Sequence, residues 1–411
     1  MKITAALIGA GGRGQFSYAP YALQNPNEIE FVAVAEPRDF LRKEFVNAHH
    51  IHKERAFESW EKMLKCDQMA DCLLICTQDT MHVEPALLAI KKGYKYILLE
   101  KPIDPDLEQC KKLATDAREN DVNIQICHSL RYTPYFRKLK DVLDSNIIGD
   151  IVNIINTEGV GFFHYAHSYV RGDWANTNDS SPMILAKCCH DMDIILYLTG
   201  KNCRSISSYG KLSHFTLKNA PEGSTARCTD NCKVKETCPY NAERIYTKFD
   251  DFKKLACEKE GFSELNQALQ VGRYGKCVYR CDNNAVDHQT VNMLFENDLS
   301  VVLTMSAFSH KIGRTIRIMG TMGEIIGDVE NSVIEVHRFA SNQSDKIEVQ
   351  HSTAGHHGAD EIMMQDFVDL VTTKTGNASS IGISIQSHAM CHAAEVSRHE
   401  KRTVELSELL F

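Results

Sequence analysis

Short apolar runs alternate with amphipathic segments over the first 130 residues of the chain. Each run has the length of a strand and lacks a polar face, which is typical of strands buried in a parallel sheet. The predicted strands are the run that begins at Ile3, then Glu30–Ala35, Asp71–Thr77, Tyr96–Glu100 and Asn123–Cys127. The predicted helices between them begin near Phe40 or cover His82–Gly93 and Leu107–Asn120. This alternation predicts a parallel sheet with helices on both faces.

The pattern changes after residue 130. Asp150–Gly159 alternates apolar and polar residues, as a strand does when one of its faces meets solvent. Four later strands with turn residues between them are predicted at Val286–Phe295, Leu299–Ser306, Thr315–Met319 and Glu324–Asp328. The predicted helices of this half are Tyr135–Ser145, Met183–Leu198 and Asp360–Thr373. Together they predict a second domain, residues 131–411, that is α/β with a mainly antiparallel sheet.

Gly9, Gly11 and Gly14 follow the first predicted strand directly and form the pattern G-x-G-x-x-G. In a dinucleotide-binding fold these glycines allow a tight turn, close approach of a pyrophosphate and close packing of the next helix. Glu36 ends the second predicted strand about 20 residues later, where such folds place a ribose-binding carboxylate. Residues 1–130 are therefore predicted to form a Rossmann dinucleotide-binding domain. The alternative is an ordinary strand–turn–helix with a surface Glu36.

Charged residues near these motifs bear on which cofactor binds. Glu36 would accept hydrogen bonds from the ribose hydroxyls and repel a 2′-phosphate, which favours NAD. Arg38 stands two residues later and could accommodate that phosphate, so NADP is the alternative. Arg13 lies in the glycine loop and either approaches the pyrophosphate or is solvated.

Composition narrows the function classes. The chain has 411 residues, 43% hydrophobic and 24% charged, which is ordinary for a soluble globular protein of two or three domains. A net charge of −8 and the lack of a basic stripe argue against a nucleic-acid partner. No apolar stretch reaches transmembrane length, so no membrane partner is expected. The first apolar run is too short for a clear signal peptide and ends in the glycine turn, so we expect a cytoplasmic protein.

Glu100-Lys101-Pro102 stands at the end of a predicted parallel strand. Ligands of such sheets bind beyond the carboxyl ends of the strands. A lysine there can donate and accept a proton when burial or a nearby positive charge tunes it. The alternative is a solvated lysine before a proline turn.

Five segments occur in a fixed order: Gly9–Gly14, Thr77–His82, Glu100–Pro102, His128–Tyr132 and His190–Asp193. In order and spacing they resemble the Gfo/Idh/MocA family, which includes glucose–fructose oxidoreductase and inositol dehydrogenase. The resemblance covers nearly the whole chain. The order of the segments is specific, although each segment alone is not.

The resemblance implies an NAD(P)-dependent oxidoreductase that acts on a ring hydroxyl of a sugar, a sugar derivative or a cyclitol. The residues it places at the cofactor are Gly9, Gly11, Gly12, Arg13, Gly14, Glu36, Arg38, Thr77, His82, Glu100 and Lys101. It further implies that the second domain has an open sheet, often used for homodimer or homotetramer contacts, and forms one wall of the substrate pocket. Lys101 is expected to contact substrate and cofactor, with His190 as its catalytic partner.

The chain departs from the family pattern one helical turn before His190. Many members carry an Asp there, whereas this chain has Ala186 followed by Lys187. Residues three apart on a helix share a face, so Lys187 and His190 could both point at substrate, with Lys187 in a catalytic polar role. The alternative is that Lys187 points outwards and that Lys101 and His190 carry the acid–base work.

Four further side chains are candidates for substrate binding. Arg131 could bind a hydroxyl or carboxylate, Trp174 could stack on a sugar ring, and Asp191 follows the catalytic His190. Arg131 and Trp174 could equally pack at the domain junction. His356 belongs to a turn before a helix that could close over substrate, and the alternative is an exposed loop.

The 15 cysteines are an odd number at scattered positions, which does not suggest a secreted disulfide framework. Cys228, Cys232 and Cys238 lie close together in a polar segment, and Cys277 and Cys281 follow. Members of the family typically lack such a region, so residues about 211–282 are predicted to be an insertion. The thiolates suit a structural zinc site with Cys277 or Cys281 as the fourth ligand. Reduced buried thiols or an iron–sulfur cluster are the alternatives.

Three functions remain open from the sequence. The first is the dehydrogenase just described. The second is an NAD-dependent glycosidase, which oxidises a sugar transiently so that its aglycone leaves by elimination. The third is a non-catalytic dinucleotide-binding sensor, which the missing Asp favours and the pair of Lys101 and His190 opposes.

Overall fold

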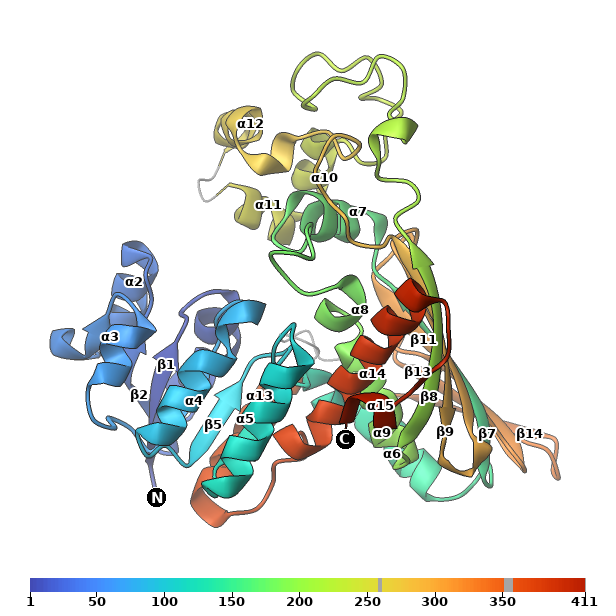
Figure 1. The fold of residues 1–411 in the computed structure, drawn as a ribbon, viewed down its shortest axis with the longest axis horizontal. Helices are drawn as coiled ribbons and strands as arrows, with labels where there is room; N and C mark the ends of the chain where they lie inside the picture. The colour runs from blue at the N-terminus through green and yellow to red at the C-terminus, as the bar shows by residue number, and fades with distance from the viewer. Residues whose placement is uncertain (258–260, 351–357, 411) are drawn as a thin grey trace.

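The computed structural model describes residues 1–257, 261–350 and 358–410 and contains two β-sheets (Figure 1). The first has six strands in the order β3-β2-β1-β4-β5-β6, and all of its neighbouring strands are parallel. Its strands are β1 (Ile3–Ile8), β2 (Ile29–Ala35), β3 (Ala56–Phe57), β4 (Cys72–Ile75), β5 (Tyr96–Leu99) and β6 (Asn123–Ile126). The parallel sheet predicted from the apolar runs is confirmed, and only the short edge strand β3 was not expected.

Helices cover both faces of this sheet. Those formed by the first third of the chain are α1 (Ala19–Gln24), α2 (Asp39–His49), α3 (Trp60–Lys65), α4 (Val83–Lys91) and α5 (Leu107–Glu119). A helix from the far end of the chain, α13 (Ala359–Thr373), joins them, because its Met363 and Phe367 share a buried cluster with Leu7 and Leu74. A C-terminal segment thus completes the core of the first sheet.

The second sheet has nine strands in the order β14-β13-β12-β11-β7-β10-β9-β8-β15. Only β7 and β10 pair in parallel, so the mainly antiparallel prediction is confirmed. Its strands are β7 (Ile151–Gly159), β8 (Cys203–Lys211), β9 (His288–Phe295), β10 (Ser300–Ser306), β11 (Gly313–Gly320), β12 (Gly323–Asp328), β13 (Val333–Arg338), β14 (Gln343–Glu348) and β15 (Val404–Glu405).

One face of the second sheet is covered by helices and the other is open (Figure 1). Its helices are α6 (Pro134–Asp144), α7 (Phe162–Tyr165), α8 (Met183–Ala186), α9 (Cys189–Thr199), α14 (Ile381–Glu400) and α15 (Ser407–Leu410). The long α14 buries Ala389 and Met390 in the same cluster as Ile194 and Ile206 of α9 and β8. None of the described helices has the length and apolar character needed to cross a membrane.

The helix predicted over Met183–Leu198 is divided into α8 and α9. Its predicted stop is confirmed, since Gly200 ends α9 with a left-handed φ of 62°. The division falls at Lys187 and Cys188, and its physical origin lies in the contacts of the site described below.

A long excursion, residues 212–287, separates the adjacent strands β8 and β9. We call it the insertion; the sequence predicted one at about 211–282. It carries α10 (Ala242–Lys248), α11 (Asp250–Ala256) and α12 (Phe262–Val271), which lie beside α7 and away from both sheets (Figure 1). Aromatic rings attach it to the second domain, because Phe249 stacks on Phe163 with centroids 3.8 Å apart.

Candidate active site

The glycine loop after β1 is tight at its ends and open in its middle. Gly9 has a φ of 89°, and a Cβ there would lie 2.6 Å from the Cys76 carbonyl oxygen. A Cβ on Gly14 would lie 2.2 Å from the Gly9 carbonyl oxygen. At Gly12, by contrast, a Cβ would meet nothing within 4 Å. This shape fits a pyrophosphate resting on the backbone at the start of a helical segment.

The guanidinium of Arg13 turns inward from this loop. Its Nε lies 2.8 Å from Glu100 Oε1, and its Nη2 lies 2.9 Å from Asp360 Oδ1 at the start of α13. Tyr18 also hydrogen-bonds to Glu100. Burial opposes ionisation of Glu100, but Arg13 and Lys101 outweigh it and hold the pKa of Glu100 below its usual value. Arg13 thus joins the glycine loop to the end of β5 and to α13, a position that neither reading of the sequence anticipated.

Glu36 and Arg38 form a salt bridge at the end of β2. Glu36 is buried, and its Oε1 accepts from the backbone N and the Nε of Arg38 at 3.0 and 2.7 Å. The Arg38 side chain is 54% exposed, and its Nη2 would lie 3.1 Å from a Cβ on Gly11. The pair therefore stands beside the glycine loop. There Glu36 is placed to bind ribose hydroxyls, and Arg38 is placed to bind a 2′-phosphate.

Replacing Glu36 by Ala tests this competition. The variant loses the carboxylate that repels a 2′-phosphate and releases Arg38 to pair with it. We expect the ratio of kcat/KM for NADP over NAD to rise by about 100-fold or more, since a like-charge contact costs several kcal/mol. Steady-state kinetics with both cofactors measure the ratio, and Glu44→Ala, an exposed acid on α2, is the control. An unchanged ratio would remove Glu36 from cofactor selection.

His82 holds together the loops that follow β4 and β5. Its buried ring has Nδ1 2.6 Å from the Pro102 carbonyl oxygen and Nε2 3.0 Å from the Thr77 carbonyl oxygen. The Thr77 hydroxyl donates to the Met81 carbonyl oxygen at 2.7 Å. His82 therefore fixes Thr77 and the Glu100–Pro102 segment at the same edge of the sheet.

Lys101 leaves this edge and reaches the second domain. Its Nζ donates to the Ala186 carbonyl oxygen at 2.9 Å. In an unbroken helix that carbonyl oxygen would accept a hydrogen bond from the N–H of His190. Here α8 ends at Ala186, and Lys101 donates to its carbonyl oxygen instead. Ala186, which stands where many family members have an Asp, is thus both the residue at which the helix divides and the residue that Lys101 of the first domain contacts.

Two histidines, His128 and His164, lie close to the lysines of the site, and His128 is fully buried. The His128 ring meets that of His190 edge to face, with centroids 5.7 Å apart. Burial, then Arg131 and Lys101, hold the pKa of His128 well below its usual value. Burial, then Lys187 and other neighbours including Lys101, do the same for the pKa of His164 on α7. Both imidazoles are therefore neutral near pH 7. They add no positive charge beside Lys101 and Lys187.

The sequence predicts neither histidine as a site residue. His128 belongs to one of the family segments, which was the available signal. His164 has no recognisable motif around it, and only the fold brings it to Lys187.

Lys187 points toward the second sheet. Its Nζ lies 3.4 Å from Oε1 of Glu158, which is buried on β7, and the Lys187 side chain is 18% exposed. Glu158 also pairs with Arg314 at 2.9 Å. Burial raises the pKa of Glu158, against the opposing effect of Arg314 and Lys187. Lys187 thus belongs to a charged network behind the site, and its catalytic role stays a prediction.

Asp191 belongs to the same network. Its Oδ1 accepts from Arg314 Nε at 2.9 Å and from Asn156 Nδ2 at 3.1 Å, and the carboxylate is buried. Arg131 is similarly occupied, since its Nε and Nη2 reach the two oxygens of buried Asp193 at 2.6 and 2.7 Å. The structure therefore places Asp191 and Arg131 in ion pairs that attach elements to one another, which is the packing alternative considered for Arg131.

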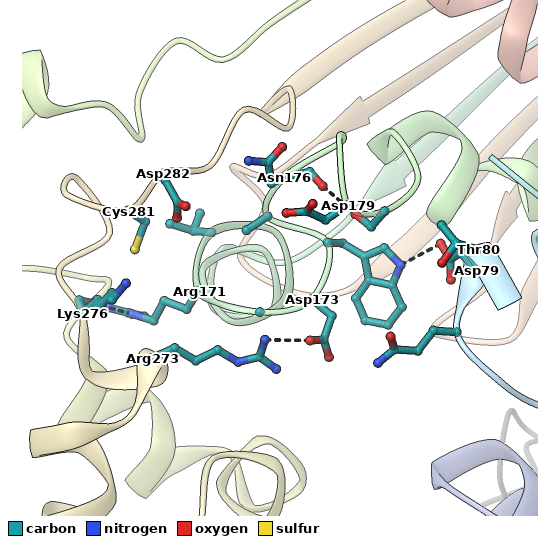
Figure 2. A pocket seen from close by; sticks show the side chains of 16 residues that line it. Asp79, Thr80, Arg171, Asp173, Asn176, Asp179, Arg273, Lys276, Cys281 and Asp282 are labelled. Carbon is teal, nitrogen blue, oxygen red and sulfur yellow. Dashed lines mark hydrogen bonds and ion pairs between the residues drawn. The ribbon is translucent and has the colours of Figure 1, made fainter. Parts of the chain in front are cut away.

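Trp174 lies at a cavity of about 340 Å³ between the first sheet and the insertion. Its Nε1 donates to Asp79 Oδ2 at 3.0 Å. Figure 2 shows Asp79 and Thr80 on one side of this cavity, and Arg171, Lys276 and Cys281 on the other. The cavity is lined by Gln78, Asp79, Thr80, Val170, Arg171, Gly172, Asp173, Trp174, Ala175, Asn176, Asp179, Ser180, Arg273, Lys276, Cys281 and Asp282.

This cavity does not contain the catalytic candidates. Lys101, Lys187 and His190, all within the described residues, are absent from its lining. Its walls carry both signs of charge, including the ion pair of Arg273 and Asp173 at 2.6 Å. We therefore interpret it as the outer part of the site. The predicted substrate residue His356 lies outside the described residues.

Five cysteines of the insertion are reduced thiols in the structure: Cys228, Cys232, Cys238, Cys277 and Cys281. Across the described residues, no three His, Cys, Asp or Glu side chains are arranged to hold a metal ion. Cys228, Cys232, Cys238 and Cys277 nevertheless line one small cavity, whereas Cys281 lines the outer cavity of Figure 2. The zinc site remains a prediction, and the structure groups Cys277 with the first three cysteines in place of Cys281.

Comparison with known proteins assigns the family. The profile of an "Oxidoreductase family, NAD-binding Rossmann fold" (GFO_IDH_MocA) matches residues 3–128, and the profile of its C-terminal alpha/beta domain matches residues 140–406. The chain belongs to the Gfo/Idh/MocA oxidoreductase family. The resemblance inferred from the five segments and the two-part fold class is confirmed, and residues 3–128 belong to an NAD-binding Rossmann fold.

Individual relatives are distant. The chain is 19% identical over 360 residues to "Putative oxidoreductase YteT" of Bacillus subtilis, covering 82% of this chain and 81% of the relative. It is 24% identical to scyllo-inositol 2-dehydrogenase (NAD(+)) of the same organism, over 51% of this chain and 58% of the relative. A structure of levoglucosan dehydrogenase in complex with NADH and levoglucosan superposes with a TM-score of 0.73 at 16% identity, covering 99% of this chain and 100% of that one. These likenesses support the fold and the family and leave the substrate open.

Proposed function

We propose that this oxidoreductase oxidises a ring hydroxyl of a sugar, a sugar derivative or a cyclitol, with NAD as the preferred hydride acceptor. The observation that carries the proposal is the contact of Lys101 Nζ with the Ala186 carbonyl oxygen, which brings the lysine of one domain to the start of the helix that bears His190. The names of scyllo-inositol 2-dehydrogenase and levoglucosan dehydrogenase among the relatives support the substrate class.

The residues divide the work as follows. The nicotinamide, when bound, accepts the hydride from the carbon that bears the hydroxyl. Lys101 and His190 bind that hydroxyl and remove its proton. Neutral His128 supports the His190 ring from the side, and Arg13 with Glu100 fixes the strand end from which Lys101 projects.

A substrate screen tests this function. Sugars, cyclitols and glycosides are incubated with NAD or NADP, while NADH absorbance and product formation are followed together. The proposal expects stoichiometric NADH and keto product from at least one polyol. Aglycone release with bound NAD but no net NADH would instead establish the glycosidase. Tight NAD binding without any turnover across the panel would favour the sensor.

We also propose that the open face of the second sheet mediates self-association as a homodimer or homotetramer. Ile155 on β7 and Ile326 on β12 are 42% and 39% exposed, and both are register neighbours of Arg317 on β11. We expect Ile155→Glu combined with Ile326→Glu to give monomers in light scattering, because charges would replace the apolar contact. Ile383→Glu, at an exposed position on α14, is the control. A monomeric wild-type protein would contradict this proposal.

A further inference from the structure

Four cysteines of the insertion line a cavity large enough for one water molecule or one metal ion. Cys228, Cys232, Cys238 and Cys277 line a cavity of about 10 Å³. A space of this size holds about one water molecule, so it can accept a single ion and nothing larger. The cysteines come from two stretches far apart in the sequence, which the backbone bond from Cys277 N to the Ala226 carbonyl oxygen brings together at 2.9 Å.

A backbone amide is directed at the sulfur atom of Cys228. The N–H of Ala242 donates to Cys228 Sγ at 3.4 Å. An amide donor also suits a metal-bound thiolate, because such a donor stabilises negative charge on its acceptor.

A buried cation faces the same cavity. Arg171 is 3% exposed and lines the cavity, with its Nη2 3.7 Å from Cys228 Sγ. Its Nε and Nη2 donate to the carbonyl oxygens of Lys276 and Tyr240 at 2.7 and 2.8 Å, while its buried Nη1 has no hydrogen-bond partner among the described residues. A buried guanidinium without a carboxylate is costly, because its charge has lost water and gained no counter-ion.

We propose that the insertion binds one zinc ion through Cys228, Cys232, Cys238 and Cys277. Binding releases the four thiol protons to solvent and leaves a Zn(Cys)₄ group with two negative charges. Arg171 supplies the positive charge that such a group needs in a buried place. Since the described sulfurs do not yet converge as a metal-binding set, the thiols turn about their Cα–Cβ bonds toward the cavity when zinc binds.

The position of Arg171 gives this zinc a role beyond local folding. Arg171 lines both the cysteine cavity and the outer cavity of the candidate active site. In Figure 2 it lies next to Lys276 and Cys281 on the insertion side of that outer cavity. The metal would therefore hold the insertion wall of the outer cavity in place, which is a structural role distinct from the hydride chemistry.

Metal analysis of the full chain, purified without chelator, tests the proposal. We expect about one zinc ion per chain by inductively coupled plasma mass spectrometry. Cys228→Ser and Cys238→Ser should each reduce it to less than about a tenth of an equivalent under the same conditions. Cys281→Ser should keep the full amount of zinc. The sulfur of Cys281 donates to the Cys277 carbonyl oxygen at 3.4 Å, and Cys281 does not line the cavity. Cys66→Ser, at an exposed position outside the insertion, is the second control.

A measurement on the wild-type chain covers the case in which the cysteine variants do not fold. After zinc removal, titration with cobalt should produce the charge-transfer and d–d absorption of a tetrahedral thiolate site, saturating at about one equivalent. Metal-free protein that binds neither zinc nor cobalt would overturn the proposal. So would iron with acid-labile sulfide, a disulfide among the four cysteines in the isolated protein, or full zinc content in Cys228→Ser.

Discussion

Lys101→Ala is expected to lower kcat by about 10²- to 10⁴-fold, the usual contribution of a positioned acid–base group. Its Nζ donates to the carbonyl oxygen of Ala186, the last residue of α8 in the second domain. We expect most of the NAD affinity to come from the glycine loop and Glu36, so the loss of the Lys101 contact should change that affinity by less than about threefold. Steady-state kinetics and NAD titration of the same preparation separate the two effects.

Lys138→Ala is the matched control, because Lys138 is an exposed lysine on α6. The pH profile distinguishes chemistry from simple positioning. If Lys101 is catalytic, the residual rate of Lys101→Ala should depend on pH differently from the wild-type rate. If its role is purely structural, the substitution should lower the rate by the same factor at every pH. Full turnover in Lys101→Ala would remove this residue from the reaction.

Asp193→Ala is expected to destabilise the fold by about 3–5 kcal/mol, since it leaves the Arg131 guanidinium buried without its partner. The two side chains meet through a pair of bonds at 2.6 and 2.7 Å, and the Asp193 carboxylate is fully buried. Arg131 also donates to the Ala378 carbonyl oxygen at 2.9 Å, so the pair attaches the end of β6 to both α9 and the segment before α14. Urea unfolding followed by circular dichroism measures the loss.

Asp144→Ala provides the comparison, because Asp144 pairs with Lys140 at the surface, where such a pair contributes about 1 kcal/mol or less. A double variant, Arg131→Met with Asp193→Leu, should recover much of the stability, because no buried charge is then left alone. If Asp193→Ala were as stable as Asp144→Ala, Arg131 would instead be available to substrate, as the sequence allowed.

The parallel sheet was predictable because its strands are buried on both faces and therefore read as continuous apolar runs. The long helix α14 was not, because Ser384, Ser387 and His388 are buried in it and interrupt the apolar stripe. These polar side chains bond within the core, as when His388 Nε2 accepts from the Ile103 backbone N–H at 2.8 Å. A pattern of apolar spacing cannot anticipate polar groups whose partners come from distant parts of the chain.

The candidate site was predictable where a motif fixes it and not where tertiary contacts do. The glycine loop and Lys101 follow from local sequence at strand ends. The inward turn of Arg13 depends on Asp360, hundreds of residues away along the chain, and so had no local signal. The pairing of Asp191 with Arg314 is likewise a contact between α9 and β11 that the spacing of residues does not reveal.

The most direct test of the account is a crystal structure of the chain with NAD⁺ and a turned-over polyol or its unreactive analogue. The account predicts the pyrophosphate over Gly11 and Gly12, the ribose at Glu36, and one ligand hydroxyl within about 2.6–3.2 Å of both Lys101 Nζ and the His190 ring. A nicotinamide bound elsewhere, or Lys101 and His190 on opposite sides of the ligand with no shared hydroxyl, would contradict it.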